Sequence, residues 1–250
     1  MASRHNTGYI WIMAGNKLIK QLKEEIEKYI GIPYWRNHWS NLTLLKEGPF
    51  GGKGTWQQIN YATKCATQKE NKKNKRQRSP PLAELNTQQI YNLRKRNHIG
   101  IDCSGLCYHL LDKLDKLKGN HGILFKTTGV DKPFGVLGVN KVSASELTHP
   151  QNSTKIADYN NIQTGDLIRF DKGKHVIFII EKKRNTIYYI HSSDKTKTRG
   201  VHYGTIKITN PNKSLNYQQW SDQTLKGNNY YSKFFFPNSS DGVFRLNCWL

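Results

Sequence analysis

The pattern of apolar residues changes once along this 250-residue chain, and this change constrains the fold more than any other feature. In the first half, apolar residues recur at helical spacing, as in Asn16–Ile30, Thr87–Arg96 and the leucine stripe from Leu106 to Leu117. In the second half, short runs of β-branched and aromatic residues are separated by short polar connections, which is typical of antiparallel strands. Helices followed by strands predict an α+β domain.

Five segments of the second half are predicted strands. They are Asp166–Asp171, His175–Lys183, Thr186–Ser193, Val201–Thr209 and Gly242–Cys248. Only a few polar residues separate the second segment from the third, so we expect a hairpin there. A turn at Lys182–Asn185 places His175 opposite His191, or nearly so, on one side of the sheet.

The first predicted helix covers Asn16–Ile30, with Asn16 as its cap and Gly31 as its stop. The apolar run before it, Gly8–Gly15, is interpreted as a strand or a tail. This run is too short to span a membrane and lacks the cleavage pattern of a signal peptide. We therefore expect neither a membrane span nor export by the general route.

A basic segment at about residues 61–98 interrupts the regular patterns. Residues 61–81 are rich in Lys, Asn and Gln and show no periodicity, which predicts a flexible insertion. The short helix expected at Thr87–Arg96 leads the chain back to Cys103. Because neither side of the insertion has a complete pattern alone, residues 1–250 are predicted to form a single domain.

The charge of the chain is strongly positive, with 39 Lys and Arg residues against 18 Asp and Glu residues and a formal net charge of +21. The run Lys69–Arg78 accounts for only part of this excess, so the positive charge is spread over the molecule. Such a surface attracts polyanions at long range. Nucleic acid and anionic cell-wall polymers are both possible partners, and a solvated surface without a specific ligand is the alternative.

One of the four cysteines, Cys103, is placed where a helix is expected to begin. Asp102 can cap that helix, and the free amides and dipole of a helix start favour thiolate over thiol. A buried structural cysteine is the alternative. Cys65, Cys107 and Cys248 complete no disulfide or zinc pattern, and Cys107 is expected to pack in the core. If His175 and His191 meet, one imidazole can orient the other as a base for Cys103.

These residues resemble the NlpC/P60 cysteine peptidases. The matching blocks, in the family's order, are Asp102-Cys103-Ser104-Gly105-Leu106, Gly165-Asp166-Leu167, His175-Val176 and His191. Pro33-Tyr34 and Gly51-Gly52 also have counterparts upstream of the family's cysteine. In the family these two upstream pieces lie close together and near the cysteine, whereas here residues 35–50 and 61–98 intervene.

The resemblance implies a papain-like fold and an endopeptidase that hydrolyses an amide bond in the stem peptides of bacterial peptidoglycan. It implies Cys103 as nucleophile, His175 as general base and acid, and His191 as the residue that orients His175. The amide of Cys103 and the hydroxyl of Tyr34 would bind the oxyanion, with Asp102 and Ser104 helping to position the site. No metal or cofactor is required, and action at a bacterial wall, as a phage lysin, an effector or a protein exported by another route, is expected.

Three other functions fit parts of the sequence. A nucleic-acid-binding module would explain the charge and the aromatic residues Trp35, Trp39 and Trp56, but no recognised nucleic-acid motif is present. An acyl-group transferase on a papain-like scaffold is disfavoured, because such relatives place the histidine before the cysteine. A non-catalytic scaffold on a papain-like fold is the third alternative, and it predicts an unreactive Cys103.

The net charge predicts salt-dependent association with anionic walls. Binding to purified cell walls, measured by pelleting, should weaken several-fold between about 0.05 M and about 0.5 M salt, because salt screens exposed charges. A parallel titration with single-stranded DNA at physiological salt distinguishes a wall-binding protein from a nucleic-acid-binding module. Wall binding that is insensitive to salt would contradict the electrostatic interpretation.

Overall fold

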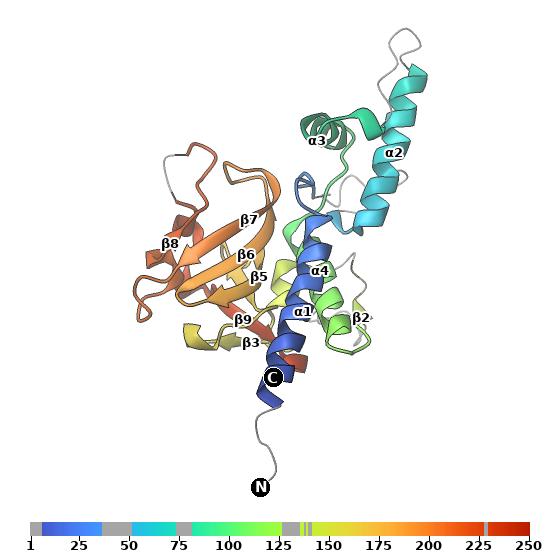
Figure 1. Cartoon of the computed structure of the whole chain (residues 1–250). Coiled ribbons are helices and arrows are strands. Elements are labelled where there is room, and N and C mark those ends of the chain that lie inside the picture. The colour runs from blue at the N-terminus through green and yellow to red at the C-terminus, as the bar shows by residue number, and fades with distance from the viewer. Residues whose placement is uncertain are drawn as a thin grey trace.

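A seven-stranded antiparallel sheet forms the centre of the protein, and helices cover one of its faces (Figure 1). The structure is a computed structural model that describes residues 7–36, 52–73, 82–126, 136–137, 139, 142–227 and 230–250. The helices are α1 (Thr7–Glu27), α2 (Trp56–Lys73), α3 (Thr87–Arg96), α4 (Cys103–Leu117) and α5 (Ala144–Leu147). The α+β class expected from the sequence is confirmed.

The strand order of the large sheet is β3-β9-β4-β5-β6-β7-β8, and every neighbouring pair is antiparallel. Its strands are β3 (Ser153–Ile156), β4 (Leu167–Phe170), β5 (His175–Lys183), β6 (Thr186–Ser193), β7 (Gly200–Lys207), β8 (Gln219–Trp220) and β9 (Gly242–Leu246). Two further strands, β1 (Phe125–Lys126) and β2 (Val136–Leu137), pair separately. The predicted strands β5 and β6 have the expected bounds, whereas β3 and β8 are additions that have no clear pattern in the sequence.

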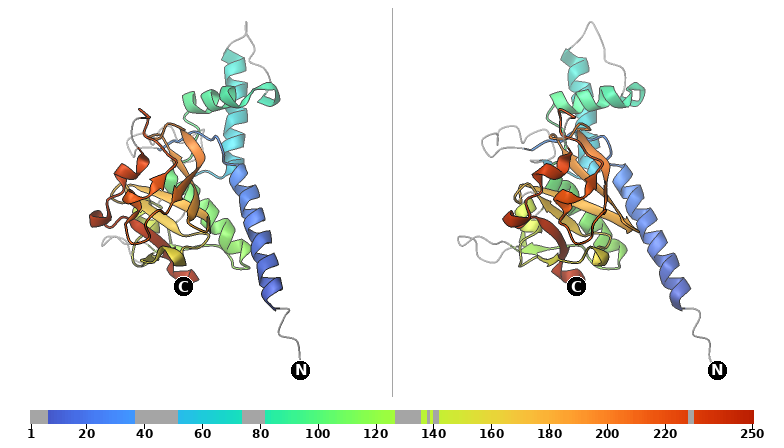
Figure 2. Two further views of the ribbon diagram at one scale, coloured as in Figure 1. Left: turned by 60° about the vertical axis from the view of Figure 1, so that its left-hand side comes forward. Right: turned by 90° about the vertical axis from the view of Figure 1, so that its left-hand side faces the viewer.

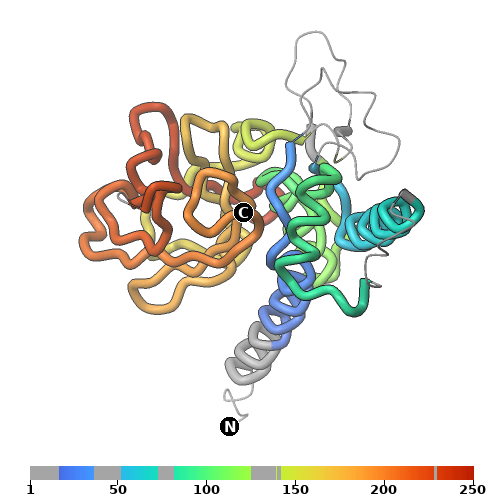
Figure 3. Tube along the Cα trace, turned by 90° about the horizontal axis from the view of Figure 1, so that it is seen from above, coloured from blue at the N-terminus to red at the C-terminus, as the bar shows by residue number. Residues whose placement is uncertain are grey.

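Apolar clusters cover both faces of the sheet. On one face, residues of α1, α2 and α4 pack against Val176, Phe178 and Ile190. On the other face, Ile177 and Tyr189 pack against segments from the C-terminal part of the chain. Viewed from above, α4 lies on one side and the strands lie on the other (Figure 3). The strands in the middle of the sheet are therefore buried on both faces, which explains their nearly continuous apolar sequences.

Helix α4 forms where the leucine stripe and its cap predict it. Leu106, Leu110 and Leu114 lie on one buried side of the helix. The side chain of Asp102 accepts a hydrogen bond from the Gly105 amide at 2.6 Å, which satisfies a donor of the first turn. Beyond the last turn, Gly119 adopts a positive φ of 90°, which ends the helix. Local sequence and tertiary packing thus fix the position of Cys103.

The β5–β6 hairpin brings its two histidines to the same face through a β-bulge. Near the turn Lys183 pairs with Thr186, but beyond the bulge Ile179 pairs with Tyr189, because Ile180 is an extra residue in β5. Continuing the second register places His175 opposite Ser193, two residues from His191. The two histidines are therefore nearly opposite each other, as expected, and not directly paired. The two histidines are diagonal neighbours on one face, since side chains alternate with a period of two.

Two expectations for the first half of the chain are wrong. Gly8–Gly15, expected to be a strand or a tail, is helical, because α1 begins at Thr7 and not after Asn16. The expected flexible insertion is helical over residues 61–73, where Ile59, Ala62 and Ala66 of α2 are buried against the core. The apolar residues of α2 are few and small, and the many polar residues between them made the helical pattern hard to recognise in the sequence. Residues 74–81 lie outside the described residues, and helix α3 has the expected bounds.

Helices α2 and α3 lie together at one end of the molecule, beyond the sheet, as two further views show (Figure 2). Arg96 of α3 pairs with Glu70 of α2 through two hydrogen bonds of 2.6 Å.

Among the described helices, none combines the length and the apolar character needed to cross a membrane. The single domain over residues 1–250 stays a prediction.

A buried ion pair joins β9 to the start of β4 and yields a stability prediction. Arg245 Nε donates to Asp166 Oδ1 at 2.8 Å and Arg245 Nη2 donates to Asp166 Oδ2 at 2.9 Å. Arg245→Met leaves the carboxylate of Asp166 buried without its partner, so the free energy of unfolding in urea should fall by about 3–5 kcal/mol. The control Lys155→Met, at an exposed position on β3, should change it by less than about 0.5 kcal/mol. Equal effects of both variants would contradict this role of the pair.

Candidate active site

Cys103 is the first residue of α4, and the N-cap residue before it is anchored to the loop that precedes α2. The amide of Asp102 donates to the carbonyl of Gly52 at 2.9 Å. Lys53 Nζ donates to Asp102 Oδ1 at 2.8 Å and also bonds the hydroxyl of Ser104. Because both partners of this ion pair are buried, the loop holds the helix start in a fixed place.

Asp102 and Ser104, two of the predicted site residues, are hydrogen-bonded to each other and to Lys53. Ser104 Oγ donates to Asp102 Oδ1 at 3.1 Å and lies 3.2 Å from the carbonyl of Val142. Both side chains are at most 5% exposed, so they face the protein interior. Asp102 and Ser104 therefore position Cys103 and do not line an open surface. Lys53 was missed in the sequence, where nothing distinguishes it from the other lysines.

The loop approaches α4 more closely than a side chain would allow. A Cβ atom on Gly105 would lie 2.4 Å from the carbonyl oxygen of Gly52, and one on Gly52 would lie 2.1 Å from that of Trp35. Gly52 also has a positive φ of 80°. The second glycine of the predicted Gly-Gly pair thus contacts the helix start directly, whereas Gly51 lies outside the described residues.

The surroundings of Cys103 disfavour its ionisation. Burial raises the pKa of the Cys103 thiol to about 11, and the carboxylate of Asp102 adds to this increase. The backbone N–H of Val176 and the ammonium group of Lys53 act in the opposite direction but are weaker. The expectation of a thiolate from the helix start is therefore wrong for this structure, because desolvation outweighs the dipole of the helix. At neutral pH Cys103 is a thiol.

A chain of hydrogen bonds runs behind His175. His175 Nε2 lies 3.0 Å from His191 Nδ1, and His191 Nε2 lies 3.0 Å from Asp222 Oδ2. His202 Nε2 lies 3.0 Å from His191 Nε2 and 3.3 Å from Asp222 Oδ1. Burial lowers the pKa values of both His175 and His191, so both are neutral near pH 7. The predicted meeting of the two histidines is thus present in the structure.

The partners of these rings determine where the protons are. Because a carbonyl only accepts, His202 Nδ1 carries the proton that it donates to the Gly200 carbonyl at 3.0 Å. Burial raises the pKa of Asp222, but hydrogen bonds from His191 and His202 outweigh it and hold that pKa well below its usual range. The ionised carboxylate therefore accepts a hydrogen bond from the N–H group at His191 Nε2. His191 Nδ1 then accepts from His175 Nε2, which leaves a lone pair on His175 Nδ1.

Cys103 and His175 are brought to the same end of the sheet, where β5 begins. The Val176 amide that hydrogen-bonds Cys103 belongs to the residue after His175. Within the described part of the chain, no direct hydrogen bond joins the sulfur to the imidazole. Tyr231, in the short helix Tyr231–Phe234, has its ring centroid 6.3 Å from that of His175, and the charge of Cys103 raises its pKa in addition to burial. The side chains of Cys103, His175 and Tyr231 thus form one group.

His202 and Asp222 were missed in the sequence. His202 lies directly opposite His191 in the β6–β7 pairing, which could have been found from the two predicted strands. However, the connection between the two strands, residues 194–199, does not fix their register in the sequence, and a slip of one residue in the pairing reverses the face of every side chain. Asp222 follows the two-residue strand β8, which is too short to have a recognisable pattern.

A cavity of about 700 Å³ opens beside His175. The predicted residue Tyr34 lines it and lies near Cys103 through its pairing with Ile101. Burial raises the pKa of the Tyr34 hydroxyl, so this group stays protonated and can donate a hydrogen bond. The basic side chains that line the cavity outnumber the acidic ones; they are Arg36, Lys95, Lys174, Lys195 and Arg199, against Asp171 and Asp194. The cavity therefore suits an anionic ligand.

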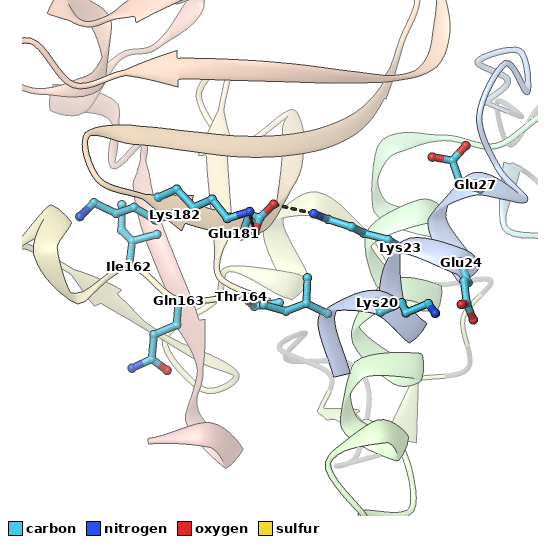
Figure 4. Close-up of a pocket in the computed structure, with 11 residues that line it drawn as sticks. Lys20, Lys23, Glu24, Glu27, Ile162, Gln163, Thr164, Glu181 and Lys182 are labelled. Carbon is cyan, nitrogen blue, oxygen red and sulfur yellow. Dashed lines mark hydrogen bonds and ion pairs between the residues drawn. The ribbon is translucent and has the colours of Figure 1, made fainter. Parts of the chain in front are cut away.

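A second cavity, of about 740 Å³, lies between α1 and the β5–β6 hairpin (Figure 4). Its lining includes Lys23, whose Nζ lies 2.6 Å from Glu181 Oε1, and Lys183, whose Nζ lies 3.0 Å from Glu181 Oε2. The described lining residues include no cysteine or histidine. The pair between Lys23 and Glu181 joins the helix to the sheet.

The raised pKa of Cys103 predicts the pH dependence of its alkylation. At pH 8 about one Cys103 in a thousand is ionised, so its reaction with iodoacetamide should accelerate about tenfold per pH unit up to about pH 10. Mass spectrometry of the labelled peptides measures this rate beside that of the half-buried Cys65. A plateau already reached near pH 7 would show a thiolate and contradict this description of the site.

Comparisons of the chain with protein-family models, with curated proteins and with solved structures found no match. The papain-like fold and the NlpC/P60 membership expected from the motif therefore stay predictions.

Proposed function

We propose that this protein is a cysteine peptidase of the NlpC/P60 type that hydrolyses an amide bond in peptidoglycan stem peptides. One observation carries the proposal. A cysteine at the start of a buried helix lies against the first residues of β5, and His175 there begins a hydrogen-bonded chain through His191 to Asp222. An acid–base group that is oriented by a second and a third residue is the arrangement that nucleophilic catalysis requires.

The reaction begins from a neutral thiol and a neutral imidazole. His175 Nδ1 takes the thiol proton as the sulfur attacks the carbonyl carbon, and the same proton then passes to the leaving amine. The resulting thioester is hydrolysed by water, which His175 deprotonates in turn. The hydrogen bond between Cys103 and His175 forms when the substrate binds, because catalytic hydrogen bonds often tighten only in that complex.

The oxyanion of the tetrahedral intermediate forms at the start of α4. The backbone N–H of Cys103 and the Tyr34 hydroxyl donate to it there. Both donors are held before the reaction begins, since Cys103 follows the anchored Asp102 and Tyr34 pairs with Ile101. Donors that need no reorganisation lower the barrier most effectively.

The cavity beside His175 supports an anionic substrate. Stem peptides of peptidoglycan carry free carboxylates, and the basic residues around the cavity complement them. The positive charge of the whole chain would hold the enzyme near anionic wall polymers. The particular amide bond that is cleaved follows from mass spectrometry of the fragments released from defined muropeptides.

Replacing the nucleophile provides the central test. Cys103→Ala should abolish cleavage of purified peptidoglycan, measured by the release of soluble fragments, because it removes the thiol that lies beside the start of β5 and His175. Cys107→Ala is the matched control, since Cys107 lies one turn further along the same helix and is fully buried. It should retain most of the activity.

The proposal fails if Cys103→Ala cleaves as fast as the wild type, or if the folded wild type releases no fragment from any peptidoglycan.

Asp222→Asn keeps the shape of the side chain but removes the anionic acceptor of His191. It should lower kcat by about 10–10⁴-fold, with the upper limit set by a wrong histidine tautomer. Circular dichroism establishes that each variant is folded.

A further inference from the structure

Three side chains converge at the face of the sheet that carries Tyr189, and their hydrogen atoms cannot satisfy all of the contacts among them. His191 of β6, His202 of β7 and Asp222 each offer one donor atom, and these atoms lie within 4.8 Å of one another. All three residues are at most 7% exposed. When His202 is neutral, the single hydrogen on His191 Nε2 lies between His202 Nε2 and Asp222 Oδ2, and His202 Nε2 faces Asp222 Oδ1 at 3.3 Å, lone pair against lone pair.

Protonation of His202 does not remove the conflict. The Nε2–H groups of His191 and His202 would then oppose each other at 3.0 Å. One contact of the three is thus unfavourable in either state. A cation at the centre would accept lone pairs from all three atoms and remove the conflict.

The spacing of these atoms is close to that around a small tetrahedral metal ion, and the atoms need to separate by only roughly 0.3 Å to reach it. Zinc bonds of 2.0–2.2 Å place neighbouring ligand atoms roughly 3.3–3.5 Å apart. The two Nε2 atoms lie 3.0 Å apart, and each faces its own oxygen of Asp222: His191 Nε2 lies 3.0 Å from Oδ2 and His202 Nε2 lies 3.3 Å from Oδ1. Two imidazoles with one carboxylate favour Zn²⁺ and neighbouring transition metals over Mg²⁺ or Ca²⁺.

The outer contacts are those that metal ligands usually have. His202 Nδ1 donates to the Gly200 carbonyl, and the hydroxyl of Tyr189 donates to Asp222 Oδ2 at 2.6 Å. Such partners orient the ligands and fix their tautomers. The other nitrogen of His191 faces His175. A metal ion here would therefore act directly on the residue that carries the proposed acid–base chemistry.

We propose that His191, His202 and Asp222 bind one Zn²⁺-class ion, and that the bound ion and a catalytically competent His175 exclude each other. The second part rests on the proposed peptidase function. Metal on His191 Nε2 places the ring proton on Nδ1, which then donates to His175 Nε2. The proton of His175 moves to its Nδ1, so that atom no longer accepts a proton from Cys103. The number of protons is unchanged, since the one displaced from His191 Nε2 is balanced by the one gained at His175 Nδ1.

Metal binding is tested in the full-length Cys103→Ala variant, which separates it from catalysis. Co²⁺ should bind with the visible bands of a tetrahedral nitrogen and oxygen site and without sulfur charge-transfer bands, and Zn²⁺ should displace it at one equivalent. Adding His202→Gln or Asp222→Asn to this variant should weaken Zn²⁺ binding at least about tenfold. The added control His121→Gln, at an exposed histidine outside the cluster, should leave binding unchanged.

Asp222→Asn preserves the shape of the side chain, so it tests the site even if His202→Gln does not fold. Zn²⁺ should also raise the Tm of the Cys103→Ala variant, and this increase should be lost with Asp222→Asn. Equal Zn²⁺ affinity with and without these substitutions, or the absence of binding in the Cys103→Ala variant, would overturn the metal site. These results stand whether or not the protein proves to be a peptidase.

The mutual exclusion is tested by activity. Zn²⁺ should inhibit peptidoglycan cleavage in proportion to the occupancy of this site, and the inhibitory concentration should rise at least about tenfold in His202→Gln, measured on its remaining activity. An unchanged inhibitory concentration in His202→Gln would place the inhibitory ion at Cys103 itself. Full occupancy without inhibition would also overturn the exclusion.

Discussion

The carboxylate of Asp102 makes the contacts on which the geometry of the site depends. It caps α4, accepts a hydrogen bond from Ser104 and pairs with the buried ammonium group of Lys53. The loop before α2, the helix start and the sulfur therefore keep one arrangement. The same negative charge raises the pKa of Cys103, and Lys53 offsets part of this effect. The carboxylate of Asp102 thus holds the sulfur in place but makes its ionisation less favourable.

Much of the site was predictable because its signals are local. The cap and the leucine stripe fixed Cys103 at a helix start, and the bounds of β5 and β6 placed His175 and His191 on one hairpin. Lys53 and Asp222 could not be predicted, because each reaches the site through tertiary contacts between segments distant in the sequence. Helix α2 was missed since its narrow buried stripe is surrounded by lysine, asparagine and glutamine. The bulge at Ile180 was missed for a different reason, because no residue in β5 signals it.

The three histidines come from consecutive strands, and this origin explains their rigidity. His175, His191 and His202 are held by the ladder of β5, β6 and β7, and Tyr189 and Tyr231 pack around them. In such a dry environment hydrogen bonds are strong, and unmatched lone pairs are costly. A cluster that contains more acceptors than protons is therefore sensitive to any cation that can reach it. The acid–base properties of His175 depend on atoms that lie two strands away from it.

The bulge at Ile180 decides which side of the sheet each ring occupies. If the pairing near the turn continued without a bulge, His175 would lie opposite Asp194 and would point away from the side that carries His191. With the bulge, His175 lies opposite Ser193 and shares a side with His191. Deleting Ile180 would leave the pairing of Ile179 with Tyr189 unchanged, so the two rings would still share a side. The pairing beyond the bulge therefore joins the two rings, and a slip of that pairing by one residue would separate them.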